Sequence, residues 1–144
     1  MPLYAFVPIN KTNSLKMKQQ LKVLVVDDEP GILMSLEFLM KKEGYQVFIA
    51  RDGEEALDII EREIPSIILL DIMMPNVDGY EVCRFVKSTL KLSHIKIVFL
   101  SAKNKESDME KGYAIGADLY VPKPFSTRTL VSKVNALALG IATS

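Results

Sequence analysis

The chain has 144 residues, 49% of them hydrophobic, which is enough for one domain with its own core and argues against a disordered protein. Lys plus Arg and Asp plus Glu total 18 each, so no net charge directs the chain to nucleic acid or to an anionic membrane. Cys83 is the only cysteine, which excludes an internal disulfide and a multi-cysteine zinc site and fits a reducing cytoplasm.

The N-terminal segment lacks the features of a signal peptide. Residues 1–10 are mildly apolar, but prolines interrupt them, and neither a basic start nor a small-residue cleavage site is present. Met17 can serve as a translation start. We therefore expect residues 1–20 to be a flexible leader or a segment added to the natural sequence, and residues 21–140 to form one domain. No apolar run approaches the roughly 20 residues of a membrane-spanning helix, so we expect a soluble, cytoplasmic protein without membrane attachment.

From residue 21 onward, short apolar runs alternate with helical patterns. Most of the runs are continuously apolar, as expected for strands buried on both faces of a parallel sheet. The predicted strands are residues 22–27, 45–50, 66–71, 95–101 and 118–121.

Amphipathic stretches lie between these runs and after the last of them. One helical face in the first stretch is shared by Ile32, Leu33, Leu36, Leu39 and Met40. The last predicted helix spans roughly residues 126–139. Five strands alternating with helices predict a doubly wound α/β fold. The sequence shows neither an internal repeat nor a low-complexity segment.

Several residues mark the predicted helix ends. Pro30 lies where a first helical turn begins, and Gly44 follows that helix as a C-terminal cap. Asp52 has the capping-box spacing to the glutamate three residues later. The pair Asp78-Gly79 is a turn signal that shapes a loop and begins the next helix.

Polar residues follow the predicted strands at the edge where an open parallel sheet binds its ligands. These residues are Asp27, Asp28, Asp71, Ser101 and Lys123. Carboxylates 4 Å apart repel by about 4 kcal/mol per pair at an effective dielectric constant near 20, and a hard cation such as Mg²⁺ offsets this repulsion. With a metal ion and an ammonium group to stabilise charge on phosphoryl oxygens, a carboxylate can attack phosphorus and form an aspartyl phosphate.

Four segments together resemble the receiver domain of two-component response regulators. They are VLVVDDEP at residues 23–30, DIMMPNVDGYEV at residues 71–82, Ser101-Ala102 after an apolar strand, and Lys123-Pro124-Phe125. Each motif alone is weak, but their order and spacing are specific, and the resemblance covers about residues 21–139. It implies a flavodoxin-like five-stranded parallel sheet in the order 2-1-3-4-5, flanked by five helices.

The resemblance also implies the roles of the residues at the strand ends. Asp71 would be the phosphoacceptor. Mg²⁺ (or Mn²⁺) would be held by Asp28, Asp27 and Asp71, with the backbone carbonyl of Met73 as a further ligand. No organic cofactor is implied.

Three further residues complete the implied phosphoryl site. Lys123 would pair with one phosphoryl oxygen, Ser101 would donate its hydroxyl to another, and Ala102 would leave access to the group. The bond between Lys123 and Pro124 would be cis by the same resemblance.

The resemblance further implies a conformational switch. When Ser101 moves toward the phosphoryl group, Tyr120 would turn inward and remodel the face of the fourth helix, fifth strand and fifth helix. A tyrosine on an apolar strand is otherwise more often a packing residue, so this role rests on the resemblance alone. Met73 and Lys103 would lie where side chains alter the lifetime of the phosphoryl group.

The implied partners are a sensor histidine kinase or a histidine phosphotransfer protein as donor, and an output domain or downstream protein as receiver of the signal. A phosphorylation-dependent homodimer is a further expectation, whereas direct binding of nucleic acid is not expected. The protein would be a signalling phosphoacceptor that catalyses only its own phosphorylation and dephosphorylation. It would be either a stand-alone receiver or part of a longer regulator.

Three other functions compete with this interpretation. A haloacid dehalogenase-like hydrolase requires a second aspartate two residues after the nucleophile, where this chain has Met73. A flavodoxin-like flavin module needs a Gly-, Ser- or Thr-rich phosphate loop after the first strand, where residues 27–30 read DDEP. A phosphorylation-independent pseudo-receiver that acts as an interaction module stays open. His94 lacks a nearby acidic or cysteine partner in sequence and is predicted to be a surface residue.

Overall fold

The structure is a computed structural model and describes residues 16–143, so most of the predicted leader lies outside the described residues. Five parallel strands form one sheet in the order β2-β1-β3-β4-β5, which confirms the predicted order. The strands are β1 (Lys22–Val26), β2 (Gln46–Ala50), β3 (Ile67–Asp71), β4 (Lys96–Ser101) and β5 (Leu119–Pro122). Each end lies within one residue of its predicted position.

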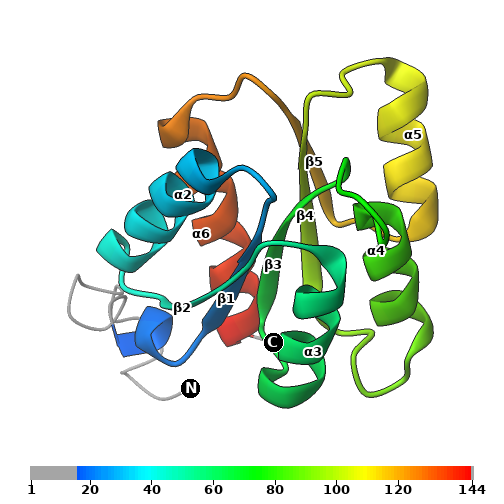
Figure 1. Ribbon diagram of the computed structural model, residues 1–144. Coiled ribbons are helices and arrows are strands. Elements are labelled where there is room, and N and C mark those ends of the chain that lie inside the picture. Colours follow the sequence, from blue (N-terminus) through cyan, green and yellow to red (C-terminus); the bar gives the residue numbers. More distant parts are fainter. Residues whose placement is uncertain (1–15, 144) are drawn as a thin grey trace.

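Helices cover both faces of the sheet, as predicted. They are α2 (Pro30–Lys42), α3 (Gly53–Glu63), α4 (Gly79–Ser88), α5 (Glu106–Ile115) and α6 (Thr127–Thr143). In Figure 1, α2 and α6 lie on one face of the sheet, and α3, α4 and α5 lie on the other. The last helix extends beyond its predicted end at residue 139. Because the first helix after β1 is labelled α2, the predicted fourth and fifth helices are α5 and α6.

The strand side chains alternate between two hydrophobic cores, one on each face of the sheet. Leu24, Ile68 and Phe99 pack with α3, α4 and α5. Val25 and Leu69 pack on the opposite face with α2 and α6. This two-sided burial explains why the strands read as continuous apolar runs in the sequence. Among the described helices, none combines the length and apolar character needed to cross a membrane.

The predicted helix ends are confirmed. Pro30 occupies the first turn of α2, and Gly44, with a φ of 101°, follows its C-terminal cap. Asp52 and Asp78 each accept a hydrogen bond from the backbone N–H three residues later, at 2.8 and 2.9 Å. These caps fix where the loops at the carboxyl edge of the sheet give way to helices.

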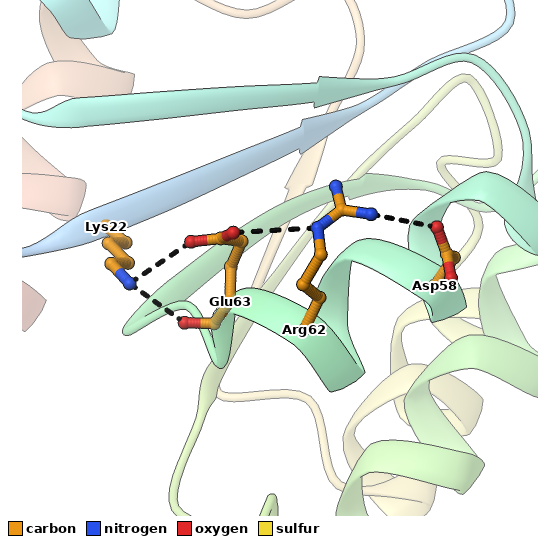
Figure 2. Close-up of polar contacts among 4 residues, drawn as sticks. All are labelled: Lys22, Asp58, Arg62 and Glu63. Carbon is orange, nitrogen blue, oxygen red and sulfur yellow. Dashed lines mark hydrogen bonds and ion pairs between the residues drawn. The ribbon is translucent and has the colours of Figure 1, made fainter.

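A chain of ion pairs ties the end of α3 to the amino end of β1 (Figure 2). Lys22 Nζ lies 3.3 Å from Glu63 Oε1 and donates to the Glu63 carbonyl at 3.2 Å. Arg62 contacts both Glu63 and Asp58, at 3.6 and 3.1 Å. This network lies at the opposite edge of the sheet from the strand ends that carry the candidate site.

A second polar contact joins residues before β1 to the domain. Residues 16–19 are helical, and Lys18 Nζ lies 3.2 Å from Glu43 Oε1 at the end of α2. The backbone carbonyl of Gln19 accepts a hydrogen bond from the Gln46 side chain at 2.6 Å. This short described part of the predicted leader therefore packs against the domain.

Candidate functional site

The register of the sheet brings the predicted site residues to one edge. Val26 of β1 pairs with Leu70 of β3, so the next residues, Asp27 and Asp71, follow at the ends of neighbouring strands. Ser101 ends β4, and β5 ends one residue before Lys123. Because all strands are parallel, their carboxyl ends share this edge.

Three carboxylates meet there in a cluster. Asp27, Asp28 and Asp71 each offer an oxygen atom, and these atoms all lie within 4.8 Å of one another. The exposed fractions of Asp27 and Asp71 are 2% and 6%, whereas Asp28 is exposed to solvent. A set of carboxylate oxygens with one open side fits a hard divalent cation that keeps some of its water ligands. The donor chemistry of the site therefore fits a divalent cation such as Mg²⁺.

Lys123 partly neutralises the cluster. Its Nζ atom lies 3.1 Å from Asp27 Oδ2 and 3.8 Å from Asp71 Oδ1. The other oxygen of Asp27 accepts a hydrogen bond from the backbone N–H of Glu29 at 2.9 Å, where α2 begins. Both oxygens of Asp27 thus already have protein donors, so Asp28 and Asp71 are the carboxylates more open to a ligand.

The environment of Asp71 raises its pKa above the ordinary value of a carboxyl group, to about 6. Burial is the largest cause of this rise, Lys123 lowers the pKa, and the charge of Asp27 raises it. The backbone N–H of Met73 contributes a smaller lowering of this pKa. A bound cation would favour the ionised form, because an opposite charge close to a carboxylate stabilises its anion.

The two predicted switch residues are connected through the backbone of Lys103. The Ser101 hydroxyl is buried and accepts a hydrogen bond from the Lys103 N–H at 3.1 Å. The Tyr120 hydroxyl donates to the Lys103 carbonyl at 2.7 Å. Only 3% of Tyr120 is exposed, so its ring points inward in this structure. The sequence predicted Ser101 and Tyr120, but it gave no sign of the backbone link between them.

The remaining predicted positions surround this cluster. The Lys123–Pro124 peptide bond is cis, as predicted. Ala102 is exposed next to Ser101, and Met73 follows Asp71 by two residues with 57% of its surface exposed. Binding of metal by the Met73 carbonyl and effects of Met73 and Lys103 on phosphoryl lifetime stay predictions. His94 is exposed, as predicted for a surface residue.

Gly79 supports the site in a way that the sequence did not reveal. A Cβ atom at this position would lie 2.3 Å from the Asp71 carbonyl oxygen and 2.7 Å from Ile72 Cα. The Gly79 N–H donates to the Ile72 carbonyl at 2.9 Å. The start of α4 can therefore pack directly against the backbone of the predicted phosphoacceptor only because residue 79 lacks a side chain. The turn motif Asp78-Gly79 was the only signal of it in the sequence.

Comparisons with known proteins agree with this geometry. The family model of the response regulator receiver domain matches residues 23–135. The receiver domain of the Francisella response regulator 1452 is 31% identical, with a TM-score of 0.78 over 85% of this chain and 99% of that one.

Two further solved structures show the same similarity. The signal receiver domain of a signal transduction histidine kinase from Syntrophus aciditrophicus is 30% identical, with a TM-score of 0.78 over 84% of this chain and 92% of that one. The BeF3-activated N-terminal receiver domain of RstA from Klebsiella pneumoniae is 26% identical, with a TM-score of 0.76 over 81% of this chain and 97% of that one.

Proposed function

This chain belongs to the response regulator receiver domain family of two-component systems, and we propose that it accepts a phosphoryl group on Asp71 and relays this change to an output partner. One observation supports the proposal most strongly: the buried Asp71 lies beside two further aspartates and the Lys123 ammonium group at the carboxyl edge of the sheet. The proposed receiver unit spans residues 21–140.

Asp28 and Asp71 would hold Mg²⁺, with Asp27 and the Met73 carbonyl nearby as further oxygen ligands. When bound, Mg²⁺ would neutralise the repulsion among the carboxylates and the charge on the phosphoryl oxygens. Asp28 is the exposed member of the cluster, so it marks the side from which metal and water have access. Binding of the cation would also keep Asp71 ionised at pH values near its raised pKa of about 6.

In the proposed transfer, a carboxylate oxygen of Asp71 attacks the phosphorus atom of a phosphohistidine. The new P–O bond forms while the P–N bond breaks, and the electron pair of that bond returns to the donor imidazole. Lys123 lies 3.8 Å from Asp71 Oδ1, near enough to reach an oxygen of a phosphoryl group attached there. Its ammonium group would stabilise the negative charge on that oxygen through a charge-assisted hydrogen bond.

The buried Ser101 hydroxyl would donate to a second phosphoryl oxygen. To do so, Ser101 would move toward the phosphoryl group, and this movement would displace Lys103, whose N–H donates to the Ser101 oxygen. Because the Lys103 carbonyl accepts the hydrogen bond from the Tyr120 hydroxyl, a movement of Lys103 would also affect Tyr120. The face of α5, β5 and α6 would then present a different surface to an output domain, a downstream protein or a second copy of the chain.

The site is less suited to the hydrolysis of external phosphate esters than to phosphorylation of its own aspartate. A phosphatase that turns over free phosphate esters needs a general acid near the leaving group. Two residues after Asp71, the chain has the exposed thioether of Met73, which cannot transfer a proton. We therefore propose a signalling protein that is phosphorylated by a sensor kinase or a histidine phosphotransfer protein in the cytoplasm.

Intact mass spectrometry tests the proposal. The purified protein is incubated with acetyl phosphate with and without Mg²⁺, beside an Asp71→Asn variant. We expect the mass of one phosphoryl group to be added only to the unmodified sequence and only with metal. Binding of fluoroberyllate, an analogue of the phosphoryl group, covers the case of a short-lived adduct. If neither adduct nor fluoroberyllate binding is found, the chain is an interaction module and not a phosphoacceptor.

A further inference from the structure

Aromatic rings contribute to the packing of helix α5 on the sheet, together with its partly buried Met109 and Ile115 side chains. Gly112 is its only buried residue. Below it, Phe99 lies between Tyr80 and Tyr120, with ring centroids 5.6 and 6.0 Å away. The neighbouring Lys111 places its Nζ atom 4.2 Å from the centre of the Tyr80 ring. The position of α5 therefore depends on the arrangement of these rings.

Gly112 of α5 lies close to the rings of Phe99 and Tyr120. A Cβ atom there would lie 2.8 Å from Tyr120 Cδ2, 3.2 Å from Tyr120 Cε2 and 3.2 Å from Phe99 Cδ2. Its φ is not in the left-handed region, so the backbone does not require glycine. A glycine inside a helix costs about 1 kcal/mol relative to alanine. The benefit of glycine at this position is therefore the space that it leaves for the two rings.

The inward position of Tyr120 is also fixed by polar contacts. Its hydroxyl donates to the Lys103 carbonyl at 2.7 Å, and its backbone N–H donates to the Tyr113 hydroxyl at 3.1 Å. Tyr113 follows Gly112 directly in α5, so adjacent residues of one helix lie against the ring and the backbone of Tyr120. The ring can lie inward only where residue 112 leaves room for it.

We propose that Gly112 is the positioning residue that allows Tyr120 to lie inward and thereby sets how much of the protein has the inward arrangement. A side chain at residue 112 competes with the inward ring for the same volume, and the ring can leave this volume by rotating toward solvent. The inward population then falls. The link from this population to phosphorylation rests on the function proposed above, whereas the effect on Tyr120 does not.

The full chain is labelled with 3-fluorotyrosine and studied by ¹⁹F NMR, and the Tyr120 signal is assigned with Tyr120→Phe. Gly112→Ala is compared with Gly140→Ala, a helical glycine in α6 at which a Cβ atom would meet nothing within 4 Å. Both variants gain the helix propensity of alanine. A soluble gadolinium chelate measures the accessibility of each ring.

In the unmodified protein and in Gly140→Ala, we expect weak relaxation of the Tyr120 signal. In Gly112→Ala, we expect its relaxation to rise toward that of Tyr113, which is 45% exposed. Equal protection of Tyr120 in all three proteins would overturn the proposal. If Gly112→Ala does not fold, the double variant Gly112→Ala/Tyr120→Ala decides: recovery of folding supports the proposed contact, and failure to recover contradicts it.

A second measurement separates this inference from the proposed function. Fluoroberyllate affinity is measured with Mg²⁺ for the same variants. By linkage, a variant that disfavours the inward arrangement binds the phosphoryl analogue more weakly. Weaker binding by Gly112→Ala, with Gly140→Ala unchanged, supports the proposal. Equal affinity of all three proteins contradicts the coupling, and absence of binding to the unmodified protein contradicts the proposed function instead.

Discussion

The Nζ atom of Lys123 lies 3.1 Å from Oδ2 of Asp27, although 96 positions separate the two residues in the chain. The contact joins the end of β1 to the residue that follows β5, across β3, which carries Asp71, and β4. It places the Lys123 ammonium group beside the predicted phosphoacceptor Asp71 and restrains the side chain of Asp27.

Replacement of Lys123 by glutamine should slow phosphorylation by acetyl phosphate. The variant loses a charge-assisted hydrogen bond to a phosphoryl oxygen, worth about 1.5–3 kcal/mol, which corresponds to roughly 10- to 150-fold in rate. Rates are measured by intact mass over time at saturating Mg²⁺. Lys133→Gln, an exposed lysine on α6, is the matched control and should react at the unmodified rate. Equal rates for both variants would remove Lys123 from the proposed chemistry.

Replacement of Asp28 by asparagine should weaken Mg²⁺ binding by at least about tenfold, because loss of even an outer-sphere partner of a metal site costs this much. Asp28 is the exposed member of the acidic cluster, so the protein should still fold. Isothermal titration calorimetry measures the affinity. The control is Asp58→Asn, an exposed carboxylate of the α3 ion pairs in Figure 2. Unchanged affinity of Asp28→Asn would contradict the proposed metal ligands.

Replacement of Gly79 by alanine should lower the free energy of unfolding by roughly 1–3 kcal/mol, the usual range for overpacking. The new Cβ atom would meet the Asp71 carbonyl oxygen at 2.3 Å, and backbone atoms there must shift. Urea denaturation measures the change. Gly31→Ala, where a Cβ atom meets nothing within 4 Å, should not be destabilised. A Gly79→Ala protein as stable as the Gly31→Ala control would contradict this prediction, because it would show that the backbone of Asp71 and Ile72 shifts at no cost.

Replacement of Tyr80 by phenylalanine should leave the free energy of unfolding unchanged or raise it by up to about 1 kcal/mol. The Tyr80 hydroxyl is buried and has no hydrogen-bond partner among the described residues, and such a group costs about 1–3 kcal/mol. The comparison is Tyr120→Phe, which removes a hydrogen bond of 2.7 Å and should destabilise by about 1 kcal/mol. A larger loss for Tyr80→Phe than for Tyr120→Phe would indicate a partner such as a bound water.

The stability should also depend on alkaline pH through Cys83. Burial raises the pKa of the Cys83 thiol to about 11, above its ordinary value of 9.0. As the pH rises from about 9 toward 11, the unfolded chain therefore loses the thiol proton before the folded protein does, and the free energy of unfolding falls. Urea denaturation at pH 8 and pH 10 should show a smaller decrease for Cys83→Ala than for the unmodified chain. An identical decrease in both proteins would contradict this account.

The fold was predictable because the sheet is buried on both faces, so that each strand is an uninterrupted apolar run such as residues 66–71. The site was predictable for a related reason. The carboxyl ends of parallel strands lie at the same edge of a sheet. Asp27, Asp71 and Lys123 lie at or just beyond such strand ends and therefore meet at that edge. The cis bond before Pro124 followed from the family resemblance.

The contacts of α5 were not predictable from the sequence. Its only buried residue is a glycine, and only the partly buried Met109 and Ile115 accompany it in the core, so the apolar pattern of this helix is weak. The hydrogen bond of the Tyr120 hydroxyl to Lys103 and the closeness of Gly112 to the Tyr120 ring depend on how α5 packs in three dimensions. Local sequence patterns do not indicate such distances.

The most direct test of the central claim is to identify the residue that carries the phosphoryl group, after its conversion to an acid-stable product. The protein is phosphorylated with acetyl phosphate and Mg²⁺ and treated with sodium borohydride, which reduces an acyl phosphate to the alcohol and thus converts aspartate to homoserine. Peptide mapping by mass spectrometry then identifies the residue. We predict homoserine at Asp71 alone. Homoserine at Asp27 or Asp28, or none at any position, would contradict the assignment of Asp71 as the phosphoacceptor.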